Sequence, residues 1–393
     1  MKTCKIFYEL DEAFFKSKNS FSTASEISRQ PDLWRDLCGI LEARKAEIVS
    51  FLERIGNLQN MRIILTGAGS SAHIGETLSF IIGKTSKIRC EAIATTDIVS
   101  SPRSVLFPNV PTLLVSFARS GSSPESTGAV QYARSIVKDL WELALVCDGA
   151  SALAKLTSES PKSMTLVMPE GSNDNGFAMT SSVSCMLLSC FAFFNSARLE
   201  EIRADIVRLS DMIEKEASRL TGISRRWAEK NYERLIVIGS GCCKGIAKEA
   251  ALKSMELTAG TVNTNYESSL GFRHGPKAVI KDNTLTIHLV SPDPLSAKYD
   301  LDLVREISRQ KKGNRIIALS TDALAVETDE NLVIPALNRG ADGELYFGIS
   351  CLVFCQLLAM FKSISLGLPT DNPVPTGELT RVVSGVTLYD LDS

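Results

Sequence analysis

The chain has 393 residues, which at about 100 to 200 residues per domain predicts two or three domains and excludes a short secreted scaffold. Lys and Arg number 43 against 45 Asp and Glu, a net charge of −2, so neither nucleic acid nor an anionic membrane is an expected partner. With 44% hydrophobic and 22% charged residues, the composition is typical of a compact globular protein and excludes a disordered one.

Residues 1–60 are predicted to be helical, and the clearest helix runs from Pro31 to Ile55. Apolar residues recur there near helical spacing, at Leu33, Leu37, Ile40, Leu41, Ile48, Phe51 and Leu52. No basic recognition helix follows a helix-turn-helix pattern, so a DNA-reading module is not expected. The charges in the first dozen residues also argue against a secretory signal.

The segment Ile63–Ser71 aligns without gaps onto Leu235–Cys243, which begins 235 − 63 = 172 residues later. Each of these glycine turns is followed by short β-rich runs that alternate with helix-like segments. The runs are Thr112–Phe117, Leu143–Val146 and Met164–Met168 in the first copy, and Thr284–Val290, Arg315–Leu319 and Asn331–Ile334 in the second. Continuous apolar strands that alternate with helices predict buried parallel sheets.

We therefore expect an α/β protein in which two parallel sheets are each flanked by helices. The predicted divisions are a helical segment at 1–60, a first domain at 61–200, a helical connector at 201–233, a second domain at 234–368 and a tail at 369–393. Two apolar runs, Val183–Phe194 and Leu345–Phe361, are shorter than the roughly 18 residues of a membrane span and predict buried helices.

Ten cysteines stand mostly in apolar stretches, and none forms a CxxC pair with nearby histidines. This usage is typical of reduced core thiols, and a cytoplasmic location is expected. The three histidines are not clustered with other metal ligands, so neither a metal nor a cofactor is expected.

The segment Ser116–Glu125 lies where a predicted strand gives way to a helix. Ser122 and Glu125 form a capping-box pattern, and Pro124 suits the first helical turn. Serines at a helix start are usually caps. Three serines and a glycine in four positions exceed what a cap needs, however, and the free N–H groups of a helix start bind phosphate well. We interpret this loop as a phosphate site.

A second turn of this type contains Gly67, Gly69, Ser70 and Ser71. With Ala72 it also fits the GxGxxA turn of a dinucleotide-binding fold, which leaves a nicotinamide enzyme as an alternative. Such a fold needs an acidic residue about 20 positions further on to bind the ribose. The candidate, Glu91, ends no hydrophobic strand, and the second copy has Lys244 where the third glycine would stand.

The helix after Gly241 places Glu249, Lys253 and Glu256 at spacings of four and three, on one helical face. A solvated stripe of ion pairs is the simpler interpretation. The helix begins at the carboxyl end of a predicted strand, however, and runs into a long loop, Gly260–Pro276, of the kind that is usually functional.

That loop contains His274, framed by Gly275 and Pro276. His288 falls in a predicted strand and is interpreted as structural, whereas His73 is ambiguous. A carboxylate and an imidazole are the groups that a 1,2-proton shift on a sugar phosphate requires.

Taken together, these residues resemble a double sugar isomerase (SIS) protein, and most closely the AgaS family of galactosamine-6-phosphate deaminases/isomerases. The most specific stretches are SFARSGSSPES (116–126), NDNGFAMTSS (173–182), ESSLGFRHGP (267–276) and RVVSGVTLY (381–389). The chain is also similar to the isomerase half of glucosamine-6-phosphate synthase, whose motif EGALKLKE…KHGP is matched by Glu249–Lys253, Glu256 and His274–Pro276.

The resemblance implies two SIS domains and a role for each residue. Glu256 would be the base that moves the C2 proton to C1, His274 would open the sugar ring, and Lys253 and Glu249 would support Glu256. The implied substrate-binding residues are Ser70, Ser71, Arg119, Ser120, Ser122, Ser123 and Arg381. Arg381 stands where the synthase has a lysine that closes over the sugar, and an arginine suits clamping better than acid/base work. The role of Glu267 is left open.

The implied reaction converts D-galactosamine 6-phosphate to D-tagatose 6-phosphate and ammonia. Aldose–ketose isomerisation without deamination, another sugar-phosphate lyase or deglycase, and a non-catalytic sugar-phosphate sensor remain alternatives. In the synthase the counterpart of His274 reaches into the neighbouring subunit's site, so the resemblance also implies a homodimer with a shared site and leaves higher assembly open.

Overall fold

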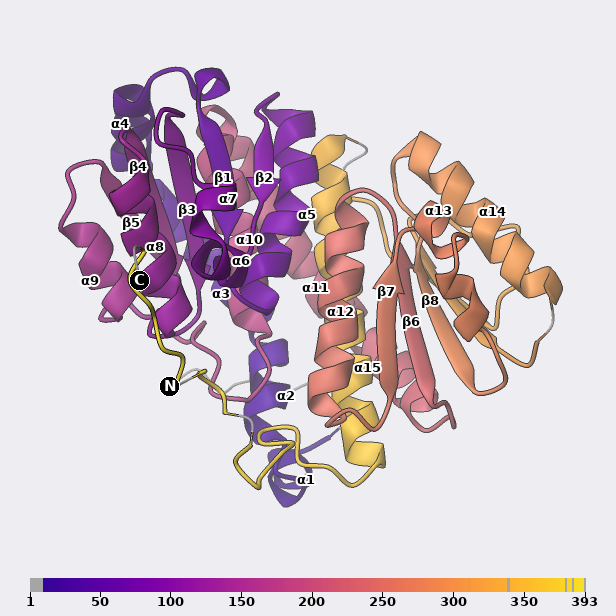
Figure 1. The fold of residues 1–393 in the computed structure, drawn as a ribbon. Coiled ribbons are helices and arrows are strands. Elements are labelled where there is room, and N and C mark those ends of the chain that lie inside the picture. Colours follow the sequence, from indigo (N-terminus) through magenta and orange to yellow (C-terminus); the bar gives the residue numbers. More distant parts are fainter. Residues whose placement is uncertain (1–9, 311, 338–339, 379, 384, 392–393) are drawn as a thin grey trace. The chain divides into compact units, whose positions relative to one another are not determined.

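The computed structural model describes residues 10–310, 312–337, 340–378, 380–383 and 385–391. Its core consists of two five-stranded parallel sheets with helices on their faces, which confirms the predicted α/β class (Figure 1). The chain forms two compact units, each built around one sheet. The first-sheet unit comprises Asp32–Asp174, Ser181–Val207 and the described residues from Thr376 onward. The second-sheet unit comprises the described residues up to Pro31, together with Asn175–Thr180 and Arg208–Pro375.

The first sheet has the strand order β2-β1-β3-β4-β5. Its strands are β1 (Arg62–Thr66), β2 (Cys90–Ala92), β3 (Thr112–Ala118), β4 (Leu140–Val146) and β5 (Ser163–Val167). Every residue of the central strand β3 is buried, as expected for a parallel strand covered on both faces. The apolar runs of the sequence thus predicted β3, β4 and β5 to within a few residues.

Helices cover both faces of this sheet. On one face an apolar core joins Ile64, Leu114 and Ala144 of the strands to helices that include α6 (Thr95–Ser100), α8 (Pro124–Ile136) and α9 (Ala152–Ser158). Of the remaining helices of the unit, α5 contacts β1 and β3 and α10 contacts α5 and β4. The bounds of these helices are α3 (Gln30–Ala43), α4 (Lys45–Ile55), α5 (Ser70–Thr85), α7 (Pro102–Val105) and α10 (Ser181–Phe194).

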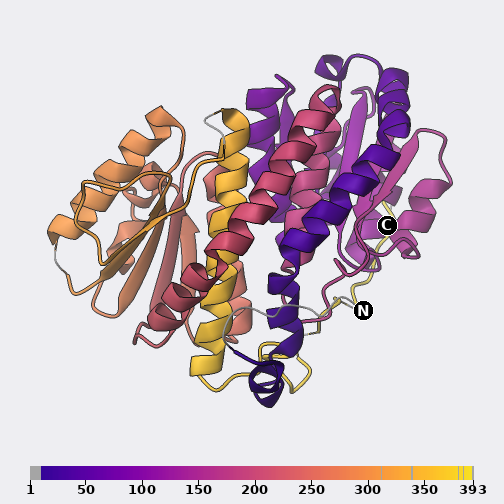
Figure 2. The same ribbon diagram turned by 180° about the vertical axis from the view of Figure 1, so that it is seen from behind.

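The second sheet repeats this order, which reads β7-β6-β8-β9-β10 when taken in the same direction. Its strands are β6 (Arg234–Gly239), β7 (Asn263–Glu267), β8 (Thr284–Leu289), β9 (Arg315–Ser320) and β10 (Glu330–Val333). Helix α14 (Pro294–Gln310) packs on one face, with α13 (Ser269–Phe272) against it. Helix α12 (Cys242–Leu257) contacts β6 and β7 and packs on α15 (Ala341–Ser365), shown in yellow in Figure 2.

The remaining helices are α1 (Glu12–Ser17), α2 (Phe21–Ser28) and the 30-residue α11 (Leu199–Ala228), with short 3-10 turns at Leu58–Asn60, Ser196–Arg198 and Pro276–Val279. The helical piece predicted over Pro31–Ile55 forms two helices, because the chain breaks at Arg44, where α3 ends and α4 begins. The predicted helical connector, 201–233, overlaps α11, which starts two residues before the predicted start and ends five residues before the predicted end.

The glycine turns of the two copies have the same backbone geometry. Gly69 and Gly241 precede α5 and α12 with φ of +56° and +58°, a region that favours glycine. A Cβ on Gly67 would lie 2.5 Å from Ser71, and one on Gly239 would lie 2.6 Å from Cys243, so neither position has room for a side chain. The internal repeat read from the sequence is therefore a structural repeat.

One sequence expectation fails at an edge strand. Gly260–Pro276 is not a long unstructured loop, since it contains β7 and α13. Glu91 is the middle residue of the short strand β2, so it ends no hydrophobic strand, and its carboxylate pairs with Arg62 at 2.9 Å. β2 has only three residues and β7 is polar, so apolar periodicity could not predict either strand.

Both apolar runs form buried helices, as predicted. α10 is buried throughout, and α15, although long and apolar enough by composition to cross a membrane, has 94% of its most apolar window buried. The nine cysteines in the described residues are free thiols, and all but Cys90 are buried. Cys4 lies outside the described residues.

His288 lies in β8, as the sequence predicted, and burial lowers its pKa to about 3. In the unfolded chain a histidine has a pKa near 6.5, so below about pH 6.5 the unfolded state binds a proton that the folded state does not bind until about pH 3. The stability that His288 contributes is therefore complete above about pH 6.5 and is lost as the pH falls toward 3.

We predict that His288→Gln flattens the decline in the free energy of unfolding between pH 7 and pH 4.5 by up to about 1.4 kcal/mol per pH unit. Urea denaturation at several pH values measures this slope. The matched control is His274→Gln, because His274 is exposed and its removal leaves no buried group changed. An unchanged slope in His288→Gln would show that burial of His288 does not set the acid sensitivity.

Candidate functional site

In the first sheet the strand order reverses between β1 and β3, and ligands of such sheets bind outside the strand carboxyl ends at this switch point. The two loops singled out in the sequence follow these two strands. Gly67–Ser71 connects β1 to α5, and Arg119–Ser123 connects β3 to α8. The fold thus places both predicted phosphate loops at the ligand-binding edge of one sheet.

The serines differ in exposure. Ser70 and Ser71 form the first turn of α5 and are buried. Ser122 is exposed, and Ser120 and Ser123 are half-buried. The two loops therefore present hydroxyls at several depths around two helix starts.

The capping box predicted for Ser122 and Glu125 is wrong. The residue preceding α8 is Ser123, and within the described chain no side chain caps this helix. The hydroxyls bond locally instead: Ser122 Oγ donates to the carbonyl of Ser120 at 3.2 Å, and Ser123 Oγ lies 2.7 Å from Ser126 Oγ. Helix capping therefore does not account for the serines of this loop, and the start of α8 remains suited to an anion.

Two arginines join the loops that follow β3 and β5. Arg119 is buried, and its Nη2 donates to the carbonyl of Arg381 at 2.6 Å. Arg381 Nε donates to the carbonyl of Asp174 at 2.7 Å, and its Nη2 donates to Asn173 Oδ1 at 2.8 Å. In this structure Arg381 thus fastens the C-terminal tail to the loop after β5.

The tail continues across α8. The side chain of Leu388 packs against Gly128, where a Cβ would lie 2.8 Å from it, and Tyr132 donates its hydroxyl proton to the carbonyl of Tyr389. The tail therefore packs on α8, the helix that directly follows the serine loop Arg119–Ser123. The expected clamping of a sugar by Arg381 stays a prediction.

The second sheet presents a different set of groups on α12. Lys253 Nζ lies 3.3 Å from Glu249 Oε1 and 2.5 Å from Glu256 Oε2. The Lys253 side chain is 0% exposed, that of Glu249 2% and that of Glu256 25%. The spacing of four and three residues thus brings one cation between two carboxylates, and only Glu256 reaches solvent.

This burial contradicts the simpler interpretation of the stripe as a solvated row of ion pairs. α12 packs on α15 along one side and on β6 and β7 along the other, so the face that carries Glu249 and Lys253 is enclosed. Buried charges are strongly unfavourable unless they are paired, and exposed ion pairs contribute little. A buried, paired triad with one member open to solvent is an arrangement that suits proton chemistry.

His274 follows α13 in the same unit, and its side chain is exposed. Its backbone N–H donates to the carbonyl of Gly271 at 3.0 Å, and Gly275 after it has φ of +123°, which only glycine adopts readily. Among the described residues, no hydrogen bond or ion pair holds its imidazole. The structure thus groups Glu249, Lys253 and Glu256 but does not join His274 to them.

Glu267, whose role the sequence left open, ends β7. Burial alone would raise its pKa, but hydrogen bonds from Lys244 and from Ser268 hold the pKa below its usual value. Lys244 Nζ lies 2.8 Å from Glu267 Oε1, and the Ser268 N–H donates to the same oxygen at 2.7 Å. Glu267 therefore joins the start of α12 to the start of α13.

Sequence reasoning missed Asp300. This buried carboxylate accepts hydrogen bonds from the hydroxyls of Ser240 and Ser269 and from the N–H of Ser291, the last at 3.0 Å. Burial raises its pKa, against the effect of these bonds. Asp300 lies within the amphipathic helix α14, where one acidic residue has no distinguishing pattern.

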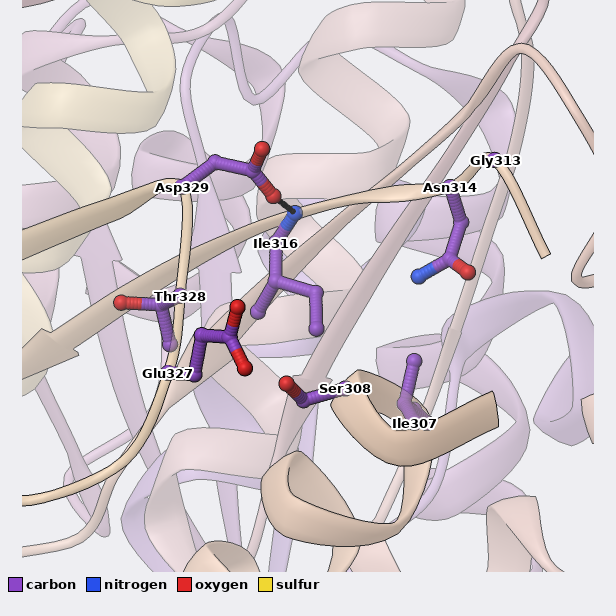
Figure 3. A pocket seen from close by; sticks show the side chains of 8 residues that line it. All are labelled: Ile307, Ser308, Gly313, Asn314, Ile316, Glu327, Thr328 and Asp329. Atoms are coloured by element: carbon purple, nitrogen blue, oxygen red, sulfur yellow. Dashed lines mark hydrogen bonds between the residues drawn. The ribbon is translucent and has the colours of Figure 1, made fainter. Parts of the chain in front are cut away.

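A cavity of about 310 Å³ in the second-sheet unit lies at the amino ends of β9 and β10, away from the carboxyl ends of the strands (Figure 3). It opens where α14 ends and before β9 and β10 begin, and Asp329 Oδ2 there accepts a hydrogen bond from the Ile316 N–H at 2.7 Å. Its lining residues are Ile307, Ser308, Gly313, Asn314, Ile316, Glu327, Thr328 and Asp329. None of the candidate residues contributes to it.

Comparison with known proteins places the chain among sugar isomerase proteins. Residues 58–196 match the SIS domain. D-galactosamine-6-phosphate deaminase AgaS from Shewanella sp. (strain ANA-3) is 39% identical over 375 residues, which cover 94% of this chain and 92% of that protein.

Two solved structures agree with this result. One from Clostridium novyi superposes with a TM-score of 0.94 at 39% identity and covers 98% of this chain and 99% of that one. The tagatose-6-phosphate ketose/aldose isomerase from Escherichia coli gives a TM-score of 0.87 at 32% identity and covers 98% and 100%. Fold, motifs and similarity along nearly the full length agree, and the chain belongs to the AgaS family of SIS-domain proteins.

Proposed function

We propose that the protein deaminates D-galactosamine 6-phosphate to D-tagatose 6-phosphate and ammonia. The observation that carries the proposal is the buried Lys253 between Glu249 and Glu256, a group suited to proton transfer, in a chain similar along nearly its full length to a deaminase of that substrate. The further divisions of the chain, 1–60, 61–200, 201–233, 234–368 and 369–393, are part of this proposal, and the SIS match at 58–196 supports the first domain.

In this account the loops of the first sheet bind the phosphate group. Ser70, Ser71, Ser120, Ser122 and Ser123 supply hydroxyls, and the starts of α5 and α8 supply backbone N–H groups and a favourable helix dipole. Arg119 and Arg381 complete the substrate-binding residues. Because the phosphate does not react, these residues serve to hold and orient the sugar.

The reaction then proceeds in four steps. His274 assists ring opening, which frees the C1 aldehyde. Glu256 removes the proton from C2. The electrons of that C–H bond form the C1=C2 bond of an enolamine, while the π electrons of the C1 carbonyl move to O1, which takes up a proton. A proton then returns to C1 as the nitrogen on C2 loses one, which gives a C2 imine. Water adds to the imine, and ammonia leaves to give the ketose.

Lys253 has two effects in this scheme. Its ammonium lies 2.5 Å from Glu256 Oε2 and fixes the direction of that carboxylate. It also favours the ionised form of the base before proton abstraction. Glu249 pairs with the same ammonium from within the core, so the cation is held from both sides.

Isomerisation without deamination is the second candidate. The same base and an enediol intermediate would interconvert an aldose and a ketose whose C2 carries a hydroxyl. The description of the Escherichia coli structure as a tagatose-6-phosphate ketose/aldose isomerase supports this candidate.

We further propose that the protein acts in the reducing cytoplasm as a homodimer. The free, buried cysteines support the compartment. The exposed imidazole of His274 and the resemblance to the synthase support a shared site. The amino-sugar phosphate is the expected partner, and no cofactor or metal enters the scheme.

We predict that the purified protein releases ammonia and ketose in equal amounts from galactosamine 6-phosphate, and that Glu256→Gln lowers kcat by about 10³-fold because it lacks the base. Coupled assays for both products, with glucosamine 6-phosphate and galactose 6-phosphate in parallel, measure this. Ketose from galactose 6-phosphate with no ammonia from either amino sugar would establish the isomerase instead. No activity on any of the three would contradict both candidates.

We predict that Ser122→Ala raises KM for the phosphorylated sugar about ten-fold and changes kcat less, because it removes a hydroxyl that, in this proposal, meets the substrate at its non-reacting phosphate. Steady-state kinetics with competition by inorganic phosphate measures the effect. The matched control is Ser158→Ala, an exposed serine of α9 whose hydroxyl bonds to the Lys155 carbonyl. Equal KM values in both variants and the wild type would refute phosphate binding by Ser122.

We predict that Lys253→Met destabilises the fold by about 3 to 5 kcal/mol, since it leaves the buried carboxylate of Glu249 without its cation. In Lys253→Met/Glu249→Gln, part of this loss should be recovered, while activity stays low because Glu256 is no longer oriented. Urea denaturation with parallel assays measures both. A double variant no more stable than Lys253→Met would contradict the pairing.

A further inference from the structure

The segment that carries His274 is bonded on both sides of the histidine to one carboxylate of α14. Arg273 Nε lies 3.0 Å from Glu306 Oε2, and Lys277 Nζ pairs with Glu306 Oε1. Arg273 directly precedes His274, and Lys277 follows it by three residues. Hydrogen bonds from Lys277 and, less strongly, the charges of Lys277 and Arg273 lower the pKa of Glu306, so it is an anion at neutral pH.

A second carboxylate of the same helix fixes the start of this segment. Asp300, buried in α14, accepts a hydrogen bond from the hydroxyl of Ser269 in the first turn of α13. Asp300 also accepts bonds from Ser240 after β6 and Ser291 after β8, so its own position is set by the sheet. From Ser269 to Lys277 the segment is therefore fastened to α14 at both ends.

The imidazole of His274 has no such support. It is exposed, and no described residue forms a hydrogen bond or ion pair with it. The residue after it, Gly275, has φ of +123°, so the backbone there has the freedom of a glycine. The direction of the imidazole consequently depends on how firmly the backbone around it is held.

We propose that Glu306 is a positioning residue for His274, acting through its two ion pairs with Arg273 and Lys277. It does not touch substrate. Its loss would release the backbone around His274 while Asp300 keeps α13 in place. The effect on turnover rests on the role of His274 given under the proposed function, whereas the ordering of the segment does not.

Glu306→Gln tests the ordering without any substrate. Hydrogen–deuterium exchange followed by mass spectrometry reports on the backbone of residues 269–280, and we expect amide exchange there to become at least about five-fold faster. The matched control is Asp302→Asn, one turn earlier on α14, which breaks only an exposed pair with Arg305 at 3.0 Å. Unchanged exchange in Glu306→Gln, or an equal increase in Asp302→Asn, would overturn the proposal.

Kinetics tests whether the effect passes through His274. We expect Glu306→Gln to lower kcat about ten-fold with KM within about two-fold of wild type, and to cause no further loss in a His274→Gln background. Glu306→Asp should recover part of kcat. A loss of equal size in both backgrounds would show a general structural effect and overturn the proposal. If the wild type does not deaminate or isomerise, the proposed function fails, and the exchange experiment still decides whether Glu306 orders the segment.

Discussion

The ion triad on α12 is the interaction on which the candidate chemistry depends. A lysine with no exposed surface is unfavourable inside a protein unless it is paired, and Lys253 is paired with a carboxylate on each side. Glu249 is enclosed with it. Glu256 retains 25% of its side-chain surface and is the member of the triad that solvent reaches. Burial thus gives two chemically identical carboxylates different surroundings.

The two copies of the fold have diverged at the same edge. Both have the strand order in which the first strand of the copy lies between the second and third, and both begin their first long helix after a glycine with positive φ. In the first copy the edge holds serines and two arginines. In the second copy the carboxylate of Asp300 already bonds to the turn after β6 and the loop after β8. Within the second-sheet unit, Asp300 thus already bonds to the loops at this edge. The side chains that distinguish the second copy, Glu249, Lys253 and Glu256, lie further along α12.

Much of the fold could be predicted from the sequence, because buried parallel strands are apolar and the glycine turns have fixed steric requirements. β3, β8 and β9 coincide with apolar runs, and Gly67 and Gly239 have no room for a side chain. The edge strands β2 and β7 could not be predicted, because β2 has only three residues and β7 is polar. The triad was predictable from the spacing of Glu249, Lys253 and Glu256, but its burial was not. Asp300 and Glu306 were missed because their partners are distant in sequence.

The central claim is that Glu256 removes the proton from C2 of the sugar. Galactosamine 6-phosphate deuterated at C2 tests it most directly, with mass spectrometry following cleavage of the C2–D bond in the wild type and in Glu256→Gln. The account predicts that the wild type moves the deuterium to C1 of the ketose or to water, and that Glu256→Gln slows this cleavage by about 10²- to 10⁴-fold. Cleavage at the wild-type rate in Glu256→Gln would contradict it.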